Sequence, residues 1–94
     1  MIEIDVRCEP ASDGWTCRVM VGAGAGATRH QVRVDRDDLR RLAPGAADPA
    51  PLVRAAFAFL LEREPKESIL RAFDLAVIGR YFPGWEADVR RRLG

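Results

Sequence analysis

The first third of the chain alternates between apolar and polar residues. Between residues 2 and 9, every second position is apolar and the positions between them are charged. This period of two is that of a β-strand with one buried face. Residues 10–14 (Pro-Ala-Ser-Asp-Gly) are typical of a turn, with Gly14 available for a positive φ. Residues 15–21 and 29–34 alternate again, so residues 1–34 are predicted to form a three-stranded antiparallel β-meander with one face in water.

The first hairpin has a register that follows from its turn. Folding the chain symmetrically about residues 10–14 places Cys8 opposite Cys17, with apolar residues opposite one another along the same face. Opposed cysteines in a hairpin are close enough to form a disulfide at some positions. Because no secretion signal accompanies them, the default expectation is a reduced pair packed as small apolar side chains, and a disulfide is the alternative.

The second pair of strands determines where the single histidine lies. We expect Val19 opposite Val34, with residues 22–27 (Gly-Ala-Gly-Ala-Gly-Ala) as a hairpin tip that lacks the spacing of a phosphate-binding loop. This register places His30 near Ala23, at the surface or at a loop edge. It also separates His30 from Cys17 by six residues along the strand, or about 20 Å, which excludes a zinc site unless the register is wrong.

After residue 34 the apolar spacing becomes that of α-helices. Asp35 is a good N-cap for a helix over residues 36–42, whose acids come first and arginines last, as the helix dipole favours. A second helix is predicted to begin at Pro49 with Asp48 as its N-cap, or alternatively at Pro51, and to run to about Glu64. Its apolar residues spread too widely for one stripe, which indicates a central buried helix or an interface helix.

Three more short helices are expected over residues 66–73, 75–82 and 85–93. The predicted fold is therefore α+β. A single small domain spans residues 1–94, with the meander over 1–34 followed by four to five short helices over 35–94, packed on one face.

The segment over residues 67–82 has the outline of a helix-turn-helix. Its turn lacks a glycine, and the second helix offers only Arg80 to read bases. Arginines near the C-terminus could contact phosphates, but they also suit a helix C-terminus without any ligand. The candidate nucleic-acid or partner contacts are Arg80, Tyr81, Arg90, Arg91 and Arg92.

The composition argues against catalysis. The chain has one His, one Lys, one Tyr, two Ser, two Thr, one Gln and no Asn, so most arrangements of a nucleophile with a base are unavailable. We therefore expect no enzyme, no metal and no cofactor. Fifteen basic residues against fourteen acidic ones leave a net charge of +1, which excludes a strongly basic nucleic-acid coat.

The N-terminal residues lack the apolar stretch of a signal peptide, and the longest apolar run, over residues 55–61, is seven residues long. A membrane-spanning helix needs roughly 20. We expect a cytoplasmic protein without a membrane partner.

Residues 57–83, FAFLLEREPKESILRAFDLAVIGRYFP, resemble a block in a family of small bacterial proteins of uncharacterised function. The resemblance covers the C-terminal half well and the N-terminal half by pattern alone. It implies a bacterial origin and a fold of hairpin strands plus helices, and it brings no activity, ligand or catalytic residue.

These observations favour a small non-catalytic module that acts in protein interaction or regulation through an unknown protein partner. A homodimer through the apolar helix or the sheet edge is one arrangement. The alternative is a helix-turn-helix-like DNA-binding regulator that uses residues 67–82.

Overall fold

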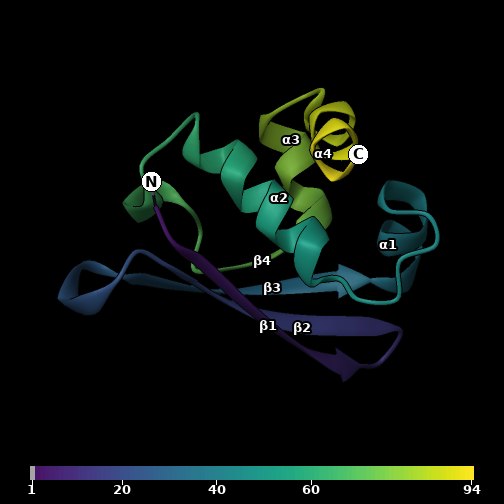
Figure 1. The fold of residues 1–94 in the computed structure, drawn as a ribbon, viewed down its shortest axis with the longest axis horizontal. Coiled ribbons are helices and arrows are strands. Elements are labelled where there is room, and N and C mark those ends of the chain that lie inside the picture. The colour runs from purple at the N-terminus through teal and green to yellow at the C-terminus, as the bar shows by residue number, and fades with distance from the viewer. Residues whose placement is uncertain (1) are drawn as a thin grey trace.

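A four-stranded mixed β-sheet forms one layer of the fold, and helices cover one of its faces (Figure 1). The structure is a computed structural model that describes residues 2–94. The strands lie side by side in chain order: β1 (Ile4–Ala11), β2 (Gly14–Val21), β3 (Thr28–Asp35) and β4 (Ala72–Asp74). The α+β class is confirmed. The antiparallel meander is confirmed for β1 to β3, but the prediction missed β4, which runs parallel to β3.

The register of the first hairpin is the predicted one, with Cys8 opposite Cys17. The residue with positive φ in its turn is Asp13 (φ 58°) rather than Gly14. Gly14 already lies in β2, and a Cβ there would collide with the main-chain oxygen of Val34 on the neighbouring strand. Position 14 therefore requires glycine because β2 and β3 approach closely there. The prediction that Gly14 supplies the positive φ of the turn is wrong.

The predicted register between β2 and β3 is wrong by four residues. Val19 lies opposite His30, and Trp15 lies opposite Val34. A shift by an even number leaves every apolar side chain on the same face, so alternation alone does not distinguish the two registers. The difference places His30 inside the sheet, where it is 3% exposed, rather than at a loop edge.

Three helices agree closely with the sequence prediction. Helix α1 (Arg36–Leu42) follows Asp35, and α4 (Trp85–Leu93) has the predicted bounds. Helix α2 (Ala50–Leu61) is preceded by Asp48, whose Oδ1 accepts a hydrogen bond from the Ala50 amide at 2.9 Å, and it ends three residues before Glu64.

The predicted helix over residues 66–73 is absent from the described chain. Lys66–Ser68 forms a short 3-10 turn, and the chain then extends into β4. A second 3-10 turn (Leu75–Val77) leads into the four-residue helix α3 (Ile78–Tyr81). The prediction of two adjacent helices over residues 67–82, on which the helix-turn-helix alternative rests, is therefore wrong. Only three residues pair in β4, too few to show a period of two in the sequence.

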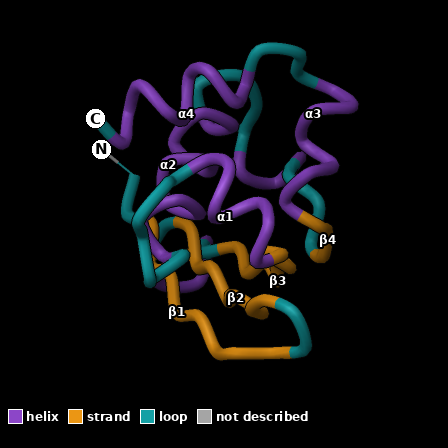
Figure 2. The backbone as a smooth tube through the Cα atoms, turned by 90° about the vertical axis from the view of Figure 1, so that its right-hand side faces the viewer, coloured by secondary structure: helices purple, strands orange, loops and turns teal. Residues whose placement is uncertain are grey.

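The core lies between the sheet and the helices. Helix α2 crosses the sheet and has α4 on its other side, which Figure 2 shows as a helical layer above the strands. Its central position agrees with the predicted buried helix. Its buried side chains are Leu52, Val53, Ala55, Ala56, Phe57, Phe59 and Leu60. Within residues 2–94, no helix is both long and apolar enough to cross a membrane.

Candidate functional site

A mostly apolar groove opens between the C-terminal end of α2, the segment that leads to β4, and α3. Its volume is about 230 Å³. Beneath α3 in Figure 2, β4 forms the adjacent edge of the sheet. The apolar side chains that line the groove include Leu60, Ile69, Leu70, Phe73, Ile78 and Phe82.

Two large apolar side chains at the groove remain exposed to water. Leu70 is 51% exposed and Tyr81 is 67% exposed, whereas the neighbouring Ile69 is buried. Of the described residues, only Ile2 is a further large hydrophobic residue with comparable exposure. Most of the exposed bulky apolar surface is therefore concentrated at one place, which is typical of a contact surface.

The buried His30 fixes the main chain at Leu70, which forms one wall of the groove. His30 Nδ1 lies 2.8 Å from the carbonyl oxygen of Leu70, and its Nε2 lies 2.8 Å from Thr28 Oγ1. The ring also lies 5.3 Å from that of Phe57, centroid to centroid. Because both ring nitrogens have partners and the ring is packed against α2, the chain at Leu70 is fixed to the sheet.

The groove adjoins an open sheet edge. The two edges of the sheet are β1 and β4, and β4 pairs with β3 on one side only. The outer backbone groups of Ala72–Asp74 therefore face away from the sheet, where an added strand would find them. Phe73, at the centre of β4, turns inward to line the groove and lies 6.1 Å from Phe57 between ring centroids.

Among the described residues that line the groove, Glu64 is the only charged one. After α2 ends, the amides of Arg63 and Glu64 both donate to the Leu60 carbonyl at 2.9 Å, and this turn brings Glu64 to the groove. Within residues 2–94, no basic group lies within 4.0 Å of its carboxylate. The groove thus combines apolar walls with one unneutralised negative charge.

The five residues singled out from the sequence lie on two helices, α3 and α4. Tyr81 lines the groove, and Arg80 is exposed on the short helix α3. Arg90 Nη2 donates to the main-chain oxygen of Arg41 at 3.3 Å. Arg91 Nη2 lies 2.6 Å from Asp88 Oδ2.

Arg92 joins the ends of two helices. It lies 2.6 Å from Glu62 beyond α2 and 2.5 Å from Asp88 on α4. Its hydrogen bonds lower the pKa of both carboxyl groups and raise the pKa of the guanidinium. Arg91 and Arg92 therefore pair with acids in the fold, and they lie in the last turn of α4, the position that the helix dipole favours for arginine.

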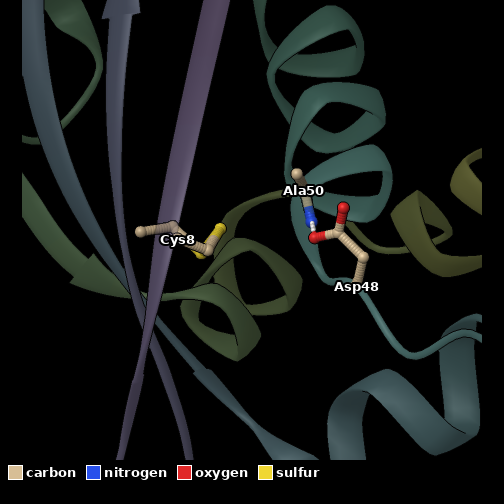
Figure 3. Close-up of a disulfide and its surroundings, with 4 residues drawn as sticks. Cys8, Asp48 and Ala50 are labelled. Carbon is tan, nitrogen blue, oxygen red and sulfur yellow. Dashed lines mark hydrogen bonds between the residues drawn. A yellow bond between two sulfur atoms is a disulfide. The ribbon is translucent and has the colours of Figure 1, made fainter.

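Cys8 and Cys17 form a disulfide, which corrects the default expectation of a reduced pair. The Cys8 sulfur lies on the side of β1 that faces the N-terminal turn of α2, where Asp48 caps Ala50 (Figure 3). His30 is a diagonal neighbour of Cys17 in the observed register, so the distance used to exclude a zinc site is wrong. No group of three or more potential metal ligands occurs within residues 2–94.

Most of the groove was not predicted from the sequence. Leu70 was assigned to a helix because β4 was not recognised, and Glu64 because α2 ends at Leu61. His30 was placed at the surface because the register between β2 and β3 was wrong. One signal was present in the sequence: Pro65 ends the helical pattern, and Ile69-Leu70 places two large apolar residues next to each other, so that both cannot face a core in an extended segment.

Comparisons with protein-family models, curated proteins and solved structures found no match for this chain. The resemblance of residues 57–83 to small bacterial proteins therefore stays a prediction.

Proposed function

We propose that the protein is a non-catalytic interaction module whose groove binds an extended segment of a partner protein. The observation that carries this proposal is the coincidence of an open sheet edge with an apolar groove. Exposed Leu70 and Tyr81 lie at the groove, and the unneutralised Glu64 contributes its only charge. None of three other cavities in the described residues is lined by Leu70, Tyr81 or Glu64.

The sheet edge suits a segment in extended conformation. The backbone of the partner segment would pair with the outer edge of β4 and so add a strand to the sheet. In such complexes, main-chain hydrogen bonds supply affinity and side-chain pockets supply specificity. One apolar side chain would enter the groove beside Phe73. A lysine or arginine nearby would lie against Glu64, whose charge otherwise has no partner.

The size of the groove favours a side chain over a cofactor. Its volume of about 230 Å³ is below the range of roughly 300–1,000 Å³ in which drug-sized ligands bind. One or two apolar side chains fill such a space. The poor catalytic composition of the chain agrees with binding without chemistry.

A second copy of this chain fits the groove less well than a foreign segment. The other open edge of the sheet is β1, whose one basic residue, Arg7, already pairs with Asp5 at 3.3 Å. A second copy that added β1 to this edge would therefore bring no unpaired cation to Glu64. Charge complementarity therefore favours a partner segment that carries a basic residue.

The proposal is tested by selecting binders from a random library of short displayed peptides on the purified protein. We expect enriched sequences that place a large apolar residue within a few positions of lysine or arginine. Leu70→Asp should abolish binding of the enriched peptides. Ile2→Asp is the matched control, because Ile2 is 49% exposed and does not line the groove.

Three outcomes would overturn the proposal. These are the absence of enrichment, enriched peptides without a basic residue, and equal loss of binding in Leu70→Asp and Ile2→Asp. Sedimentation of the two variants addresses the homodimer: a dimer that Leu70→Asp dissociates and Ile2→Asp preserves would assign the groove to a second copy instead.

A further inference from the structure

Arginines gather on the sheet face that the helices leave bare. Figure 1 shows the helices on one side of the sheet only. On the outward-facing positions, Arg7 of β1, Arg18 of β2, Arg29 of β3 and Arg71, which directly precedes β4, line a shallow concavity of about 320 Å³. Among the described residues that line it, Asp5 is the only acid, so this part of the surface carries a local excess of positive charge.

Two of these arginines lie directly opposite each other. Arg7 pairs with Arg18 in the register of β1 and β2, and like charges in such a position destabilise a sheet. Each has one acidic neighbour: Arg7 lies 3.3 Å from Asp5, and Arg18 lies 3.1 Å from Glu9. These ion pairs are highly exposed and contribute little to stability, so an anion could replace them at small cost.

The other two, Arg29 and Arg71, have no carboxylate oxygen within 4.0 Å among residues 2–94, although Arg71 is near enough to Glu67 to help lower the pKa of its carboxyl group. The Gln31 amide donates to the Arg71 main-chain oxygen at 2.8 Å, which places Arg71 beside β3 just ahead of β4. Arg29 lies two residues from Gln31 on the same strand, and therefore on the same face. The pairing of β4 with β3, which was not predicted from the sequence, therefore places Arg71 at the concavity.

We propose that this concavity binds a small anion that carries two linked phosphate groups. Guanidinium groups bind phosphate oxygens through two parallel hydrogen bonds, and four of them from adjacent chain segments suit more than one phosphate. Among the described residues, no Phe, Tyr or Trp lines the concavity, and His30, whose ring does, is only 3% exposed, so a nucleobase would find little aromatic surface on which to stack. The recognised chemistry is therefore the diphosphate group itself.

The test is an NMR titration of the isotope-labelled protein with sodium pyrophosphate at constant ionic strength, with sodium chloride as the reference salt. We expect saturable shifts that centre on the amides of Arg7, Arg18, Arg29 and Gln31. Arg29→Gln and Arg71→Gln should each weaken binding about tenfold or more. Neither side chain forms an ion pair with another described residue, so both variants should fold normally.

Arg80→Gln is the control, because it removes the same charge from an exposed arginine that does not line the concavity. We expect its affinity to stay within about twofold of that of the unmodified protein. Equal weakening by Arg80→Gln, shifts outside this face, or no saturation would overturn the proposal. A second titration uses ADP: affinity no tighter than that of pyrophosphate supports recognition of phosphate alone, and affinity at least about tenfold tighter contradicts it.

Discussion

His30 donates a hydrogen bond across the fold to Leu70, forty residues further along the chain, with 2.8 Å between Nδ1 and the carbonyl oxygen. A carbonyl oxygen only accepts, so Nδ1 carries a proton. In the neutral ring, Nε2 then accepts from the Thr28 hydroxyl at 2.8 Å. One buried imidazole therefore fixes the position of the groove wall relative to the sheet.

His30→Phe should destabilise the protein because it keeps an aromatic ring but leaves the Leu70 carbonyl and the Thr28 hydroxyl without partners. The expected loss in free energy of unfolding is about 1–3 kcal/mol, measured by urea unfolding. The double variant His30→Phe/Thr28→Val removes one orphaned group and should recover part of the loss. An unchanged unfolding midpoint for His30→Phe would contradict this role.

Gly14→Ala should be among the most damaging single-methyl additions to this chain. The new Cβ would collide with the main-chain oxygen of Val34, and no side-chain rotation relieves a clash with backbone. We expect a loss of about 3 kcal/mol or more, measured by thermal or urea unfolding. Gly26→Ala is the control, since the Cβ that this substitution adds would have no other described atom within 4 Å. Similar losses in both variants would show that strand approach is not the cause.

Reduction of the bond between Cys8 and Cys17 should lower the free energy of unfolding. The two cysteines are nine residues apart. Closing a loop of that length lowers the conformational entropy of the unfolded chain, which stabilises the folded state by about 2–3 kcal/mol. The measurement is urea unfolding with and without dithiothreitol. The variant Cys8→Ala/Cys17→Ala should be insensitive to the reductant. Equal stability of the oxidised and reduced protein would contradict a stabilising disulfide.

The ion pairs of Arg92 should make stability depend on pH in the acid range. Hydrogen bonds from Arg92 lower the pKa of Glu62 and of Asp88 in the folded state. Their contribution is therefore complete above the ordinary carboxyl pKa of about 4 and is lost as the pH falls through the lower folded values. Arg92→Gln should flatten this part of the profile of unfolding free energy against pH.

Arg90→Gln is the control for this profile, because Arg90 contacts a main-chain oxygen rather than a carboxylate. It should keep the acid dependence of the unmodified protein. A profile for Arg92→Gln that matches that of Arg90→Gln would contradict the assignment.

The sequence predicted those elements whose residues repeat over a full face. Alternation over eight residues located β1 and its register with β2, and Trp85, Val89 and Leu93 located α4. It did not predict β4, whose three residues are held by pairing with β3 and by the Gln31–Arg71 hydrogen bond. Such long-range pairing leaves no local periodicity.

The candidate site was less predictable than the fold for the same reason. Its position depends on β4 and on the true register of β3, which brings His30 inward. Only Tyr81 among the residues chosen from the sequence lines the groove. The arginines at the C-terminus were conspicuous in the sequence, but two of them pair with acids in the fold.

The most direct test of the central claim is a charge exchange between Glu64 and the basic residue of a peptide selected on the groove. Dissociation constants are measured for that peptide and for its version with glutamate at the basic position, against the unmodified protein and Glu64→Arg. The account predicts that the unmodified protein prefers the basic peptide by about tenfold and that Glu64→Arg reverses the preference. Both proteins binding both peptides equally well would contradict it.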